Sequence, residues 1–232
     1  MRTANENSLP RAATAQASSA LMHLYPVYDP VEVAADRIIH ILGVCFAAIG
    51  AVVVIVLAAQ SAHALGIVAT SLYATSLLAM VGFSAAYNLS RPSPVREIFR
   101  RLDHATIFFL IAGTYSAITL VRIDTPMSQW LAVFAWGVAL IGATTKILYP
   151  RRFERIAVAV YVALGLIVFF SLAPVLSSLS DTVLILVTIG AVLYVSGVVF
   201  HVWDGLRFQN AIWHGLVLCA AGCHYAAIVL NM

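Results

Sequence analysis

Seven long apolar stretches, separated by short polar connections, dominate this sequence and limit the folds that it can adopt. A helix that crosses about 30 Å of hydrocarbon needs roughly 20 residues, and seven stretches approach that length. They are Ile38–Ala59, Ala64–Tyr87, Ala105–Val121, Trp130–Leu148, Ile156–Leu176, Thr182–Val202 and Ala211–Leu230. The pattern predicts an all-α fold class, a polytopic integral membrane bundle of seven transmembrane helices.

The amino-acid composition favours a membrane protein over a soluble one. Hydrophobic residues make up 62% of the chain and charged residues 10%, against about 45–50% and about 25% in a soluble domain. The net charge of +3 does not indicate nucleic-acid binding, because the basic residues lie in short connections between apolar stretches. We therefore expect membrane lipids as partners and no nucleic acid, and the oligomeric state stays open.

Residues 1–36 contain no apolar stretch, so we expect no cleavable signal peptide and a first span that serves as its own insertion signal. We expect residues 1–28 to be a disordered cytoplasmic tail. Residues 29–232 are then the membrane domain.

Arginine and lysine residues are distributed unequally over the connections. Counted on alternate sides, twelve of the thirteen lie on the side of the N-terminus, and Arg122 is the exception. Short cytoplasmic loops of membrane proteins carry an excess of Lys and Arg. The bias predicts a cytoplasmic N-terminus and, with an odd number of spans, an extracytoplasmic C-terminus.

Polar side chains at one depth of the predicted bundle form a second pattern. They lie where four predicted helices begin or end, and they are Glu32, Asp36 and His40, Ser84 and Asn88, Asp103 and His104, and Asn210 and His214. Residues four apart share a face of a helix, and polar groups at membrane depth are functional candidates because hydrocarbon does not solvate them. We expect one polar chamber open to the cytoplasm. The alternative is that each is an ordinary interfacial residue or a helix cap.

Three segments of the sequence resemble the bacterial haemolysin III family, which is related to the progestin and adipoQ receptors and, more distantly, to alkaline ceramidases. The segments are FSAAYNLS, RRLDHATIFFLIAGTYS and NAIWHGLVLCAAGCHYA. The resemblance implies a seven-helix bundle in a bacterial inner (plasma) membrane, with a Ser-x3-His motif, an Asp and a His-x3-His motif on its cytoplasmic side. It implies zinc bound there by three histidines, with a water positioned by the Asp. The related enzymes hydrolyse lipid amides.

The sequence departs from this pattern at two of the three implied zinc ligands. Ser84 and Asp103 match the serine and the acid and are the candidate catalytic residues. His214 matches one imidazole, but Asn88 and Asn210 stand at the other two positions. Carboxamide oxygen is a poor zinc ligand beside Cys, His or carboxylate. We therefore expect no zinc cofactor. If a metal is bound, its expected ligands are His214 and Asp103, with Asn88 and Asn210 at the substituted positions.

Two alternatives for a metal site stay open. The first is a different ligand set at the same depth, in which Asp103 and His214 are completed by His40, His104, Glu32 or Asp36. The second is a soft-metal site of Cys219, Cys223 and His224. His224 lies ten residues beyond His214, about 15 Å deeper at 1.5 Å per residue, so we expect an interhelical hydrogen bond there.

The buried acid and the small residues give two packing predictions. Asp103 needs a polar partner if it is buried, and protonated His214 is the expected one. Gly113, Gly137, Gly165 and Gly197 are expected at close approaches between helices.

Three classes of function follow from this pattern. The first is a membrane protein with a degenerate metal site that acts in membrane-lipid or bilayer homeostasis. The second is a metal-dependent hydrolase of a lipid amide or ester, of the ceramidase-like type. The third is a transporter or pore that conducts protons or ions.

Overall fold

The computed structural model describes residues 28–61, 63–121, 125–171, 179–203 and 205–232. Apart from Tyr28, the predicted disordered tail (1–28) lies outside these residues. Within them the chain forms seven α-helices and no β-strand. The helices are α2 (Pro30–Ser61), α3 (Ala64–Leu89), α4 (Pro94–Leu120), α5 (Pro126–Leu148), α6 (Glu154–Ser171), α8 (Asp181–His201) and α9 (Gln209–Leu230).

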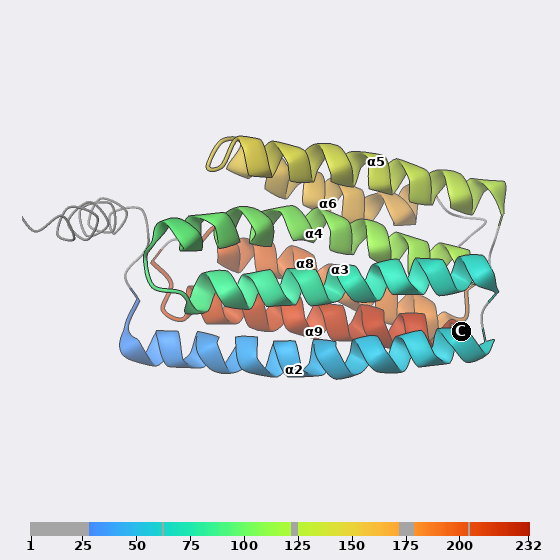
Figure 1. Cartoon of the computed structure of the whole chain (residues 1–232), viewed down its shortest axis with the longest axis horizontal. Coiled ribbons are helices and arrows are strands. Elements are labelled where there is room, and N and C mark those ends of the chain that lie inside the picture. Colours follow the sequence, from blue (N-terminus) through green and yellow to red (C-terminus); the bar gives the residue numbers. More distant parts are fainter. Residues whose placement is uncertain (1–27, 62, 122–124, 172–178, 204) are drawn as a thin grey trace, which may run out of the picture.

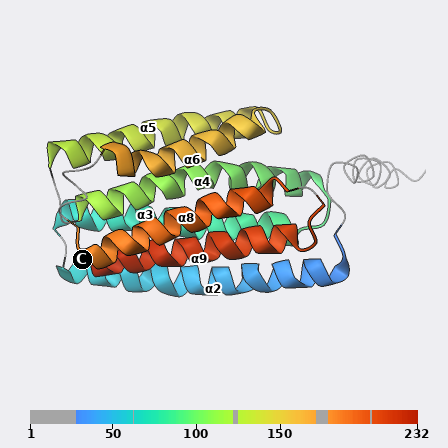
Figure 2. The same ribbon diagram turned by 180° about the vertical axis from the view of Figure 1, so that it is seen from behind.

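The helices run back and forth along the long axis of one bundle (Figures 1 and 2). The helix pairs α2–α3, α3–α4, α4–α5 and α8–α9 pack along the chain order, and α2 also packs against α9. The first and last described helices are therefore neighbours. This contact brings the start of α2 and the start of α9 together at one end of the bundle (Figure 1).

Local capping explains where several helices begin. The side chain of Ser93 accepts a hydrogen bond from the backbone N–H of Arg96 at 3.2 Å, and Pro94 occupies the first turn of α4. Serine at the N-cap and proline just inside are both typical of helix starts. Asp29 caps α2 in the same way, because its Oδ1 accepts from the N–H of Val31 at 2.9 Å. Asp36 and Asp103 therefore lie inside their helices, and the alternative that they act as caps is wrong.

Five of the described helices are long and apolar enough to cross a membrane, namely α2, α3, α5, α8 and α9. Helix α4 begins eleven residues before the predicted stretch that starts at Ala105, and its first ten residues carry five charged side chains. These findings support a helical multi-pass membrane protein. The count of seven spans and the orientation of the termini stay predictions.

The cationic side chains gather at one end of the bundle. Helices α2, α4, α6 and α9 begin at this end, where α3, α5 and α8 finish (Figure 1). Among the described residues, ten Arg and Lys side chains lie in the connections at this end or in the adjoining helical turns. They are Arg37, Arg91, Arg96, Arg100, Arg101, Lys146, Arg151, Arg152, Arg155 and Arg207.

Only two of the four predicted glycines lie at close helix contacts. A Cβ added to Gly113 would lie 3.0 Å from the Cα of Tyr73 on α3, and one added to Gly197 would lie 2.9 Å from the ring of Trp213 on α9. Among the described residues, no atom outside the local helix backbone lies within 4 Å of the corresponding position at Gly137 or Gly165. The expectation was wrong for those two, because spacing along one helix does not show which face meets a neighbour.

Candidate functional site

The carboxylate of Asp36 is the centre of a polar cluster between α2, α3 and α9. His214 on α9 donates a hydrogen bond from Nδ1 to Oδ1 of Asp36 at 2.7 Å. Asn210, one turn earlier, donates from Nδ2 to Oδ2 of Asp36 at 3.0 Å and to Oδ1 of Asn88 on α3 at 3.3 Å. The spacing of four residues in α9 places both donors on the face that meets α2.

His40 lies one turn beyond Asp36 on the same face of α2 and is 4% exposed. Its Nε2 is 3.4 Å from Oδ2 of Asp36, and its ring centroid is 4.4 Å from that of His214. Although this carboxylate oxygen is close, Nε2 is a buried polar atom without a hydrogen-bond partner among the described residues. A buried imidazole nitrogen without a partner costs stability.

A cavity of about 490 Å³ begins beside this cluster. Six of the nine candidate residues predicted from the sequence line it, and they are Ser84, Asn88, Asp103, His104, Asn210 and His214. Farther along, its wall is mostly apolar and includes Leu110, Ile118, Leu179, Val187 and Val195, with a few polar side chains such as Thr114, Tyr194 and His224. The cavity therefore has a polar end and a long, mostly apolar part.

Glu32, Asp36 and His40 do not line the cavity. Glu32 instead joins the start of α2 to the start of α9, because its Oε1 accepts from the backbone N–H of Phe208 at 2.6 Å. Phe208 precedes α9 in a left-handed conformation with φ of 61°, and this contact fixes its N–H. The role of Glu32 is therefore one of positioning.

Asp103 lies in the cavity wall, but the structure does not pair it with His214. No hydrogen bond or ion pair joins the Asp103 carboxylate to any residue that the structure describes, since His214 is engaged by Asp36. His104, the next residue, faces Glu154, with its Nδ1 3.5 Å from Oε2. Adjacent residues of a helix point in different directions, which separates the two side chains.

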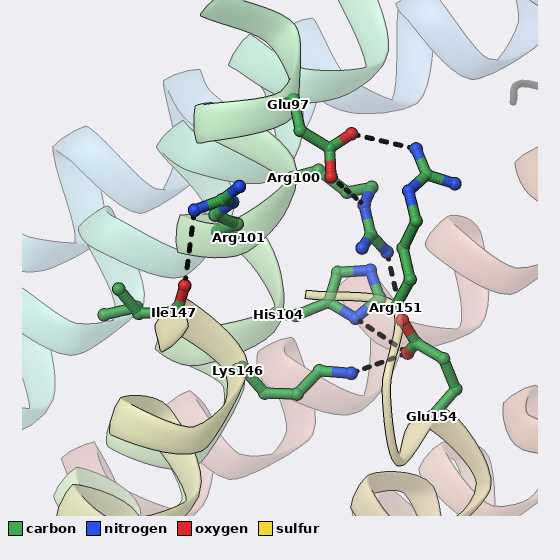
Figure 3. Close-up of polar contacts among 8 residues, drawn as sticks. All are labelled: Glu97, Arg100, Arg101, His104, Lys146, Ile147, Arg151 and Glu154. Carbon is green, nitrogen blue, oxygen red and sulfur yellow. Dashed lines mark hydrogen bonds and ion pairs between the residues drawn. The ribbon is translucent and has the colours of Figure 1, made fainter. Parts of the chain in front are cut away.

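A second charged network lies at the same end of the bundle, where α4, the end of α5 and the start of α6 meet (Figure 3). Glu154 accepts from Lys146 at 2.6 Å and from Arg100 at 3.1 Å. Arg100 also contacts Glu97 at 3.2 Å, and Glu97 accepts from Arg151 at 2.8 Å. The network ties three helices together.

The sequence interpretation missed this network because it counted these cations only as markers of orientation. The available signal was Glu97 and Glu154, two acids inside otherwise basic connections. Burial disfavours their negative charge, but His104, Lys146 and Arg100 hold the pKa of Glu154 well below its usual range. Arg151 and Arg100 likewise hold the pKa of Glu97 below its usual range, against the effect of burial.

The residues at the implied family positions do not fit a zinc ion bound by three imidazoles. Two of the three are amides, and their hydrogen bonds to each other and to Asp36 occupy them in the cluster. A different group of ligands lies close by, because one ligand atom from each of Asp36, His40 and His214 lies within 4.8 Å of the other two. The expectation of no zinc at the family positions stays a prediction.

His224 lies apart from this cluster, as predicted. Its Nε2 donates to the backbone carbonyl of Val187 on α8 at 3.2 Å, so the predicted interhelical hydrogen bond is confirmed. Cys219 and Cys223 are free thiols.

Comparison with known proteins gives the relatives of this chain. Residues 34–225 match the sequence model of a family described as haemolysin-III related. The chain is 30% identical over 187 residues to hemolysin-3 of Bacillus cereus, covering 81% of this chain and 85% of that protein. It is 29% identical over 198 residues to a hemolysin-3 homolog of Bacillus subtilis (strain 168), covering 85% of this chain and 93% of that protein. It is 30% identical over 164 residues to the human monocyte to macrophage differentiation factor, covering 68% of this chain and 67% of that protein. No solved structure matches the chain at a significant level.

Proposed function

Because this chain belongs to the haemolysin III family, we propose that it binds a membrane lipid and acts in membrane-lipid or bilayer homeostasis. In this proposal it spans the inner (plasma) membrane of a bacterium seven times, with its N-terminus in the cytoplasm. The polar end of the cavity then faces the cytoplasm, as the excess of Arg and Lys at that end favours.

The amphiphilic wall of the cavity carries this proposal. Small-molecule sites typically enclose about 300–1,000 Å³ with a mostly apolar lining and a few placed polar groups, and this cavity of about 490 Å³ fits that description. A lipid with one chain along Leu110, Ile118 and Val195 would place its headgroup beside Asn88 and Asn210.

Asp103 indicates the chemistry of the headgroup. Its carboxylate lines the cavity and has no hydrogen-bond donor among the described residues. A carboxylate at such a site is stabilised by a donor from the ligand. We therefore favour a lipid that carries a hydroxyl, an amide N–H or an amine near its headgroup.

Hydrolysis of a lipid amide or ester is the second candidate. The observation that favours it is the presence of Ser84 and Asp103 at the polar end of the cavity, next to the carboxylate and imidazoles of Asp36, His40 and His214. Ion or proton transport stays a prediction from the sequence.

Lipid binding is tested with two matched substitutions on α8. Ala191 lines the cavity, whereas its neighbour Val192 is 59% exposed on the outer surface. In detergent, a fluorescent single-chain lipid amine should bind the unmodified protein. Ala191→Trp should weaken that binding about tenfold or more by filling the cavity, and Val192→Trp should leave it unchanged. Equal binding by all three proteins would contradict the proposal.

The same lipids separate binding from hydrolysis. Incubation of the protein with a lipid amide and a lipid ester, followed by mass spectrometry, should return them intact if the protein only binds them. Release of a free fatty acid that is lost in Asp103→Asn would favour the hydrolase.

A further inference from the structure

Independently of lipid binding, we propose that Asp36, His40 and His214 bind a divalent transition-metal ion. The three side chains come from the two helices that pack as neighbours at the polar end of the bundle, α2 and α9. This ligand set shares only His214 with the three-imidazole set that the resemblance implies. It uses a carboxylate and an imidazole of α2 in place of the two positions that Asn88 and Asn210 occupy.

The distances are close to those of a metal site. In a tetrahedral site with metal–ligand distances of about 2.1 Å, neighbouring ligand atoms lie about 3.4 Å apart. The Nε2 of His40 lies 3.4 Å from Oδ2 of Asp36. The Nδ1 of His214 lies 2.7 Å from Oδ1 of Asp36, so an ion that replaced this hydrogen bond would widen the separation by about 0.7 Å. These two contacts use different oxygens of Asp36, and one ligand atom from each of the three residues lies within 4.8 Å of the other two. The ligand atoms therefore need to approach one another by up to about 1.4 Å to reach the tetrahedral separation.

The buried Nε2 of His40 is the second observation that points to a ligand. The residue is 4% exposed, and this nitrogen has no hydrogen-bond partner among the described residues although it faces a carboxylate. A neutral imidazole nitrogen offers a lone pair, and a bound cation would satisfy it. The Asp36 carboxylate lies 3.4 Å away, and its hydrogen bonds come from His214 and Asn210.

The surrounding amides hold the carboxylate in place. Asn210 donates to Oδ2 of Asp36 at 3.0 Å and is itself held by Asn88 at 3.3 Å. Hydrogen bonds of this kind orient metal ligands, and their loss typically costs 10–100-fold in affinity. The two asparagines thus support a ligand instead of acting as ligands.

The ligand types select the class of ion. Two imidazoles with one carboxylate form the ligand set of open zinc and non-haem iron sites, whereas Mg²⁺ and Ca²⁺ prefer oxygen ligands. Because His214 also lines the cavity, the site is reached from the polar end of the cavity.

The direct test is metal binding by the full chain in detergent. After treatment with EDTA and removal of the chelator, Zn²⁺ is titrated in competition with a chromophoric chelator. We expect one equivalent with a Kd of about 1 μM or tighter, retained in excess Mg²⁺. His40→Gln and Asp36→Asn should each weaken binding by about 100-fold or more, and Asn210→Ala by about 10–100-fold. His63→Gln is the matched control, because His63 caps α3 at the opposite end of the bundle.

Two results would overturn the proposal. One is the absence of a saturable equivalent of Zn²⁺ in the unmodified protein, which needs no variant and is unaffected by misfolding of a mutant. The other is an equivalent that persists in folded His40→Gln, or that is lost in Cys223→Ser, which would place the ion elsewhere. Circular dichroism and gel filtration establish that each variant is folded. The absorption of bound Co²⁺ gives a further measurement, since its visible bands should change in His40→Gln.

Discussion

The imidazole of His214 on α9 donates a hydrogen bond from Nδ1 to Oδ1 of Asp36 on α2 across 2.7 Å. The two residues are 178 positions apart in the chain, and their contact joins the first and last described helices. The expected partner of His214 was Asp103, so this pairing changes which substitutions should interact.

Asp36→Asn and His214→Gln should be coupled in a double-mutant cycle. Removing one member of a buried hydrogen-bonded pair costs about 1–3 kcal/mol, and more when the remaining group is charged, because that group is left without its partner. Each single variant should lose stability of that order, and the double variant should lose about 1–3 kcal/mol less than the sum. The measurement is chemical denaturation in detergent of protein treated with chelator, so that bound metal does not contribute.

The matched control for this cycle is Asp103→Asn with His214→Gln. These two substitutions should be additive, because no hydrogen bond joins the residues. Additivity for Asp36 and coupling for Asp103 would show that the pairing is the reverse of the one described.

Glu154→Gln should lower the stability of the protein and make that stability less sensitive to a fall in pH. The substitution removes an acceptor shared by Lys146 and Arg100, and we expect a loss of about 1–2 kcal/mol because the Glu154 side chain is 39% exposed. The pKa of Glu154 is held below its ordinary value of 4.5. The carboxylate therefore contributes stability that is fully present above pH 4.5 and is lost as the pH falls below it.

Thermal unfolding between pH 3 and pH 7 measures this effect. The midpoint of the unmodified protein should fall more steeply with acid than that of Glu154→Gln. Asp181→Asn, at the opposite end of the bundle (Figure 1), should behave like the unmodified protein. Parallel curves for Glu154→Gln and the unmodified protein would mean that the network does not stabilise the carboxylate.

Gly113→Ala should destabilise the protein, whereas Gly137→Ala should not. The new methyl group at position 113 would lie 3.0 Å from the Cα of Tyr73, and a backbone atom cannot move aside without separating α3 from α4. Overpacking of this kind costs about 1–3 kcal/mol. Gly137 is exposed, and no atom of the described residues outside its local helix backbone lies within 4 Å of an added Cβ. Alanine there should be neutral or stabilise its helix by up to about 1 kcal/mol. Melting temperatures in detergent distinguish the two, and equal effects would contradict the close approach at Gly113.

Reporter tags at the two ends of the chain should lie on opposite sides of the membrane. Seven spans require this result, and the excess of Arg and Lys predicts that the N-terminal tag is cytoplasmic. An alkaline phosphatase fusion, which is active only outside the cytoplasm, should be active at the C-terminus and inactive at the N-terminus. Activity of both fusions, or of neither, would mean that the number of spans is even.

The sequence by itself determined the helices and the residues that share a face. Apolar stretches of about 20 residues form helices in lipid because only internal hydrogen bonding satisfies the backbone there. A spacing of four residues places Asp36 beside His40, and Asn210 beside His214, since the helical period is a local property. The starts of α2 and α4 were less certain, because their first turns are polar and are defined by Asp29 and Ser93 as caps.

Only the tertiary structure decided which helices meet and at what rotation. Lipid solvates one apolar helix face as well as another, so hydropathy does not determine which helices pack together. Close packing between particular side chains determines it. Because α2 packs against α9, His214 forms its hydrogen bond with Asp36, and Asp103 lies in the cavity wall without it. Where α4, α5 and α6 meet, Arg100 and Lys146 form ion pairs with Glu154, and the sequence pattern of each helix does not indicate these pairs. Each of these contacts joins residues of different helices, and no periodicity within one helix encodes such a contact.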